Sequence, residues 1–305
     1  MINNELRQFI KLSRILGRRH DFVQGAGGNV SIKIGNKMLI KASGWRLADI
    51  SENNGLVTVD LINGNIDDKQ IFQPSIETGF HLFLDRYVVH THSVYANIIS
   101  CAVDGEKIWG DILKEFGVLA VWANYQSPGH YLALAIKKAV EEFKNRHAVA
   151  PEIVLMQNHG LIVSGNNLKR VFDLHNEIQI FIKQYLNFKK AFPNDKKDKI
   201  DFFKKFIKNN SDLIRNFSKN ILFPDQIVFC DNINDKISID ESAGNINYKI
   251  NKKEERAIEE NLIAWLYIVD CAKDCGLVLN PLSQKDLDYI NNMESEKYRQ
   301  KLIKR

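Results

Sequence analysis

The sequence is poor in cysteine and has no long run of apolar residues. Its 305 residues include 4 cysteines, and no two of them form the Cys-X-X-Cys pair that is typical of structural zinc sites and redox sites. No segment approaches the ~20 consecutive apolar residues that a membrane-spanning helix needs. The N-terminal residues lead into an amphipathic segment and lack the pattern of a secretory signal peptide. These absences favour a cytoplasmic protein with reduced thiols and no membrane partner.

A strong charge of either sign is also missing. The 42 basic and 37 acidic residues give a net charge of +5, and 45% of the residues are hydrophobic, a composition typical of soluble globular proteins. So mild an excess predicts no nucleic-acid partner, although it would suit an anionic substrate. The lysine-rich stretch 189–220 has apolar residues at helical spacing, which favours a solvated helix with one buried face over a nucleic-acid patch. We find no internal repeat and no low-complexity segment.

Apolar periodicity predicts alternating helices and strands through most of the chain. We expect helices at 5–19, 75–84, 130–146, 167–188 and 253–275, and over the last thirty residues. A further helix is expected to start at residue 93. We expect strands at 30–34, 37–41, 57–60, 88–92, 118–121, 153–156 and 161–163, with further short strands within 226–250. A change of character near residue 220 suggests a catalytic domain at 1–220 and a C-terminal α+β extension of unassigned role at 221–305.

Three of the eight histidines stand where a metal site would need them. His90 and His92 are two residues apart on a predicted strand, so both side chains point to the same side. His159 follows another apolar strand in a sharp polar turn beside Gly160. Three imidazoles at the ~2.0–2.1 Å that zinc prefers would leave a fourth coordination position open, as in catalytic zinc sites. The alternative for each histidine is ordinary packing or exposure at the surface.

Glu77 is the carboxylate that could serve such a site. It lies near the start of the helix predicted from Ser75, not far before His90. Acidic residues gather at helix starts for electrostatic reasons alone, so a structural role is the alternative. His81 lies one helical turn later, and we interpret it as a supporting residue and not as a ligand.

Two glycine-containing loops have the composition of an anion site. Gly28-Asn29 precedes a predicted strand and Ser43-Gly44 follows one, and Ser75 could complete the set. Glycine lets backbone N–H groups approach an anion closely, and Asn and Ser add side-chain donors. The alternative is that both are simple turns. The first loop is not a dinucleotide-binding fingerprint, because Val30 stands where the third glycine belongs.

Five motifs occur in order along the chain: QGAGGNVSIK, KASGW, PSIETGFH, VVHTHS and NHGLIVSG. Together they resemble the class II aldolase and adducin family over residues 5–185. The resemblance implies a layered α/β/α fold with a central, mostly antiparallel sheet, assembled as a homotetramer with sites between subunits. The segment LFPDQIVF and the short stretch between His81 and His90 are similar to the aldolase part of fused rhamnulose-phosphate aldolase/alcohol dehydrogenases. The chain ends where that dehydrogenase would begin, so we expect no nicotinamide chemistry.

The resemblance also implies roles for individual residues. His90, His92 and His159 would bind Zn²⁺ or another divalent metal, and Glu77 would be the acid/base. The residues that would cradle the substrate phosphate are Gly28, Asn29, Ser43, Gly44 and Ser75. The implied enzyme is a carbon–carbon lyase that acts on a small phosphorylated sugar through a metal-stabilised enediolate. Decarboxylation or epimerisation at the same site is one alternative, and a non-catalytic adducin-like binding protein is another.

One departure from the family pattern concerns the second proton donor. In the fuculose-phosphate enzymes a neighbouring subunit supplies a tyrosine, and Trp109 falls near that position here. The sequence therefore assigns no second proton donor.

Overall fold

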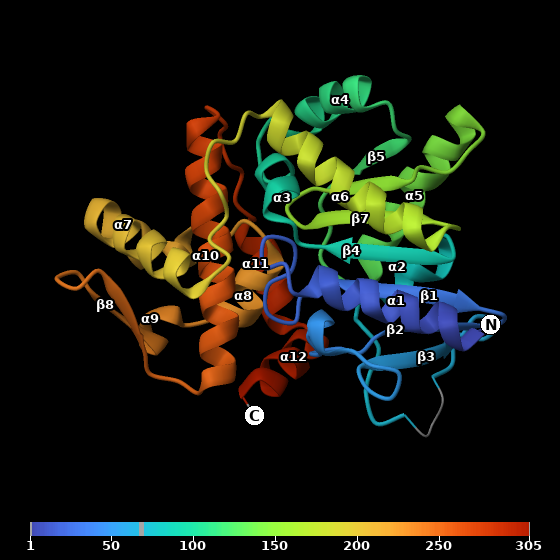
Figure 1. Cartoon of the computed structure of the whole chain (residues 1–305), viewed down its shortest axis with the longest axis horizontal. Coiled ribbons are helices and arrows are strands. Elements are labelled where there is room, and N and C mark those ends of the chain that lie inside the picture. Colours follow the sequence, from blue (N-terminus) through green and yellow to red (C-terminus); the bar gives the residue numbers. More distant parts are fainter. Residues whose placement is uncertain (1, 67–69, 305) are drawn as a thin grey trace.

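A seven-stranded sheet forms the centre of the computed structural model, which describes residues 2–66 and 70–304 (Figure 1). Its strand order is β3-β2-β1-β4-β7-β6-β5. The strands are β1 (Asn29–Ile34), β2 (Lys37–Lys41), β3 (Leu56–Asp60), β4 (Tyr87–Thr91), β5 (Ala120–Ala123), β6 (Ile153–Met156) and β7 (Gly160–Gly165). Neighbouring strands are antiparallel except for the parallel pair β5–β6. The prediction of a mostly antiparallel central sheet is confirmed.

Helices cover both faces of this sheet, because side chains alternate between the faces along each strand. On β4, Val89 faces a core that it shares with α1 (Ile2–Gly17), α3 (Val94–Ser100) and α6 (Leu168–Tyr185). Val88 faces the other side, where α2 (Thr78–Phe83) and α5 (His130–His147) pack. Helix α4 (Gly105–Phe116) packs against α3 and α6. The layered α/β/α arrangement is confirmed.

The C-terminal region is mainly helical and carries one hairpin. Its elements are α7 (Lys196–Arg215), α8 (Pro224–Cys230), α9 (Ile233–Lys236), β8 (Ile237–Asp240), β9 (Asn245–Tyr248), α10 (Lys252–Asp274), α11 (Gln284–Asn292) and α12 (Glu294–Lys304), with the short 3₁₀ turn η2 (Phe217–Lys219). Another short 3₁₀ turn, η1 (Leu47–Asp49), lies between β2 and β3. The prediction of strands from residue 226 is wrong for the segment before Ile237. A buried apolar run of this length fits a strand or a helix equally well, and Pro224 in the first turn fixes it as a helix start.

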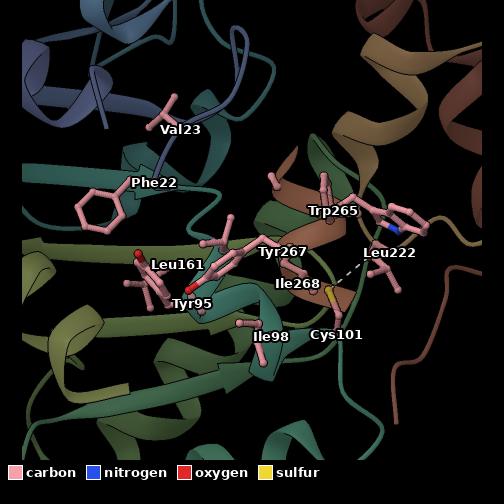
Figure 2. Close-up of a cluster of buried hydrophobic side chains, with 14 of the residues drawn as sticks. Phe22, Val23, Tyr95, Ile98, Cys101, Leu161, Leu222, Trp265, Tyr267 and Ile268 are labelled. Carbon is pink, nitrogen blue, oxygen red and sulfur yellow. Dashed lines mark hydrogen bonds between the residues drawn. The ribbon is translucent and has the colours of Figure 1, made fainter. Parts of the chain in front are cut away.

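Helix α10 packs against α3, so the C-terminal region shares the hydrophobic core of the sheet (Figure 2). Trp265, Tyr267 and Ile268 of α10 and Tyr95 and Ile98 of α3 all belong to this core. The domain boundary near residue 220 stays a prediction, and the core is continuous across it. Although α10 has 23 residues, neither it nor any other described helix is long and apolar enough to cross a membrane.

Candidate metal centre

His90 and His92 lie at the end of β4, on the sheet face that α2 covers. His90 pairs with Asn29 on β1 and with Ile162 on β7, which places it between two neighbouring strands. His92 follows directly after the strand. Their Nε2 atoms lie 3.0 Å apart, and both side chains are buried. The His-Thr-His spacing therefore brings the two imidazoles together on one side, as the sequence predicts.

His159 and Glu77 approach this pair from two other elements. His159 lies in the turn between β6 and β7, and Glu77 is the residue that precedes the first turn of α2. His159 Nε2 is 2.7 Å from Glu77 Oε1, and His90 Nε2 is 3.4 Å from Glu77 Oε2. The helix begins at Thr78, so the prediction that it starts at Ser75 is wrong by three residues. Thr78 donates its backbone N–H to the Ser75 carbonyl, which makes a turn there.

The geometry of these four side chains fits a divalent metal ion. One ligand atom from each lies within 4.8 Å of all the others. Two atoms that each bind an ion at ~2.0–2.1 Å can be no more than ~4.2 Å apart, and the three separations given above satisfy this limit. His159 Nε2 is buried and makes no aligned hydrogen bond among the described residues, although Glu77 is close. Atoms that face a common ion would have this arrangement.

The protonation states of the site also suit a metal. Burial lowers the pKa of His90 well below its ordinary value, so the ring is neutral at pH 7, as metal binding requires. Burial alone would raise the pKa of Glu77, but His90 and His159 lower it well below its usual range. Glu77 is therefore a carboxylate at neutral pH.

A chain of buried hydrogen bonds fixes the orientation of Glu77. Asn29 donates from Nδ2 to Glu77 Oε2 at 2.6 Å and to Ser75 Oγ at 3.1 Å. The other end of its amide, Oδ1, accepts from His81 Nε2, and this leaves His81 Nδ1 to accept from the Ser31 hydroxyl at 2.7 Å. Burial lowers the pKa of His81 to about 3. The neutral ring supports Asn29, in keeping with the structural role expected of it.

The five residues predicted to cradle a phosphate line one cavity beside the metal cluster. These residues are Gly28, Asn29, Ser43, Gly44 and Ser75. A Cβ at Gly28 would lie 2.8 Å from the His90 carbonyl oxygen, and the residue has φ +58°, so this position requires glycine. Ser43 Oγ is buried and has no hydrogen-bond partner in the described part of the chain, which leaves a donor for a ligand.

Lys41 lines the same cavity and was not predicted. Its ammonium group donates to the carbonyl oxygens of Ala26 at 2.9 Å and Trp45 at 2.7 Å. Burial and the nearby Arg299 lower its pKa to about 7. One signal in the sequence pointed to it, because Lys41 is the first residue of the motif KASGW.

The model of the Class II Aldolase and Adducin N-terminal domain matches residues 7–186, which is more than half of the chain. The chain belongs to the class II aldolase and adducin family. This agrees with the ordered motifs, and with the layered fold that positions them.

Curated relatives match a similar share of the chain. An L-fuculose phosphate aldolase from Methanocaldococcus jannaschii is 27% identical over 184 residues, which are 58% of this chain and 92% of that protein. The uncharacterized oxidoreductase YuxG from Bacillus subtilis is 30% identical over 211 residues, 60% of this chain, and the chain spans 30% of YuxG. A sugar-phosphate aldolase from Thermotoga maritima has the same fold, with a TM-score of 0.50 at 14% identity over 60% of this chain and 95% of that chain.

Residues outside the family match also reach the metal cluster. Asp225, at the start of α8, lies with Oδ2 2.8 Å from His92 Nδ1. Arg299 on α12 donates to the other oxygen of Asp225 at 3.1 Å and to Glu296 at 2.9 Å. Sequence reasoning did not assign these three residues. Asp225 lies in the segment LFPDQIVF, so this motif was the signal that could have found it.

Helix α12 covers the cradle that the family domain forms. A Cβ at Gly44 would lie 2.3 Å from Leu302 Cδ1, so Leu302 rests directly on this glycine. The cavity that remains has a volume of about 20 Å³. A cavity of this size holds about one water molecule, which is far less than a sugar phosphate needs.

Proposed function

We propose that this protein is a zinc-dependent aldolase that cleaves or forms a carbon–carbon bond in a small phosphorylated sugar. The observation that carries this proposal is the convergence of His90, His92, His159 and Glu77 beside a cavity lined by the five predicted phosphate-binding residues. Two relatives bear the names L-fuculose phosphate aldolase and 5-methylthioribulose-1-phosphate/5-deoxyribulose-1-phosphate aldolase, and both names describe cleavage of ketose phosphates.

The three histidines would hold the metal and Glu77 would move the proton. A bound divalent ion supplies Lewis-acid stabilisation of the negative charge that develops on a substrate oxygen. Glu77 is a carboxylate held by Asn29 within 2.7 Å of His159, so it can take a proton from a carbon or hydroxyl group beside the metal and return it. Its burial keeps bulk water away from this proton.

The cradle would bind the phosphate group of the sugar. Gly28 and Gly44 allow close approach of the backbone, and Ser43 offers a hydroxyl that has no described partner. Lys41, whose pKa is lowered to about 7, adds a partly protonated amine to the lining of the same cavity. Because Leu302 rests on Gly44, phosphate binding requires α12 to move away from the cradle.

The reaction is tested by offering the zinc-loaded protein two substrate classes. Ketose 1-phosphates should release dihydroxyacetone phosphate and an aldehyde, and a chelator should abolish the release. If the protein releases carbon dioxide from a 3-oxo-acid phosphate and no dihydroxyacetone phosphate from ketose 1-phosphates, it is a decarboxylase that uses the same site and not an aldolase. Interconversion of epimers would indicate an epimerase. Full metal loading without turnover of any of these substrates would favour an adducin-like binding protein.

A further inference from the structure

Asp225 lies behind His92, on the side of the ring that faces away from the metal cluster. His92 Nε2 lies toward His90, and Nδ1 is 2.8 Å from Asp225 Oδ2. The Asp225 side chain is 2% exposed and that of His92 is 7% exposed, so solvent screens this contact little. A carboxylate in this place accepts the second ring N–H of a metal-binding histidine, which fixes its tautomer and orientation and raises its basicity.

Two further contacts show that the position of Asp225 is defined from several sides. Arg299 donates to Oδ1 at 3.1 Å, which leaves Oδ2 for the histidine. On the third side is Gly27, where a Cβ would lie 2.3 Å from Asp225 Oδ2 and 2.8 Å from His92 Nδ1. The backbone at position 27 thus lies so close to Asp225 and His92 that only glycine fits there.

We propose that Asp225 is a positioning residue of the metal centre, and that the chain beyond the family domain completes this centre. The family match ends at residue 186, and Asp225 reaches His92 from a helix 133 residues further along the chain. The continuous core between α3 and α10 holds the two regions together. The proposal rests on the proposed function only in that His92 binds a metal.

The test measures zinc affinity and not turnover. The dissociation constant of zinc is determined by competition with a chromogenic chelator for the full-length wild type, Asp225→Asn and Asp225→Ala. Loss of an outer carboxylate typically weakens metal affinity 10–100-fold, and we expect a weakening in that range for Asp225→Asn. Asp235→Asn is the matched control, because Asp235 is an exposed residue of α9, and it should bind zinc as the wild type does.

A second variant keeps the charge and changes the geometry. Gly27→Ala would push Asp225 and His92 apart while both side chains remain, so it should also weaken zinc binding. Thermal unfolding of the metal-free proteins separates this effect from a loss of folding, because a purely structural role would lower the unfolding temperature and leave the zinc affinity of the folded protein unchanged. Wild-type affinity in folded Asp225→Asn and in folded Gly27→Ala would overturn the proposal. A wild type without zinc affinity would overturn this proposal and the proposed function together, whereas the first result leaves the proposed function intact.

Discussion

Replacing Glu77 by glutamine separates proton transfer from metal binding. Glutamine keeps the shape of the side chain and retains an oxygen that can accept from Asn29 Nδ2, which Glu77 now accepts at 2.6 Å. The lost negative charge leaves no group that can take a proton. A general acid or base typically contributes about 10²–10⁴-fold, which corresponds to about 3–5.5 kcal/mol of transition-state stabilisation. We expect turnover to fall by that factor while zinc stays bound.

The assay follows exchange of a proton of dihydroxyacetone phosphate with deuterated solvent, together with the zinc content of the purified variant. This exchange needs only the proposed proton transfer, so it can be measured on one product of the proposed reaction. Because the hydrogen bond to Asn29 can be kept, the free energy of unfolding should change by no more than about 1–3 kcal/mol. The matched control is Glu115→Gln, an exposed residue of α4, which should exchange at the wild-type rate.

Two results would refute this reasoning. Full exchange activity in Glu77→Gln would show that Glu77 is structural and that another group moves the proton. Loss of zinc would show that Glu77 is a metal ligand, a role that its 2.7 Å approach to His159 also permits. In that case the fourth coordination position is filled in the resting enzyme.

Three further predictions concern assembly, stability and the C-terminal helix. The family resemblance predicts a tetramer, so sedimentation showing only a species of the 35.1 kDa chain mass would refute a site shared between subunits. Glu260→Ala removes the buried partner of Arg46 and should lower the free energy of unfolding by about 3–5 kcal/mol. Glu255→Ala removes the partner of an exposed lysine and should lower it by at most about 1 kcal/mol. Equal denaturation midpoints for the two variants would contradict this prediction. Inorganic phosphate should speed hydrogen exchange in residues 294–304 of the zinc-loaded protein, and slower exchange with phosphate bound would show that α12 does not leave Gly44.

Much of the family domain could be predicted from local sequence alone. Strands are predicted at 30–34 and 37–41, and the observed strands, which form a hairpin, are Asn29–Ile34 and Lys37–Lys41. Alternation along β4 likewise places His90 and His92 on one side. These features depend on neighbours a few residues apart, which periodicity and turn residues describe well.

The remainder depends on contacts between distant parts of the chain. The helix before Cys230 was predicted as a strand, because its buried apolar run has no exposed face to set a helical period. The approach of Asp225 to His92 and of Leu302 to Gly44 follows from the packing of the C-terminal helices on the core. The motif LFPDQIVF could have drawn attention to Asp225, but no local pattern in the sequence encodes the packing of Leu302 on Gly44, so the cover over the cradle emerged only from the structure.

The central claim is that three histidines converge on one catalytic metal. Its most direct test is the zinc content of the purified wild type beside that of His92→Ala, measured by elemental analysis after dialysis against metal-free buffer. We predict about one zinc per chain in the wild type and the loss of most of it in the variant, because two histidines rarely hold a catalytic zinc tightly. Undiminished zinc in a folded His92→Ala protein would contradict the metal centre described here.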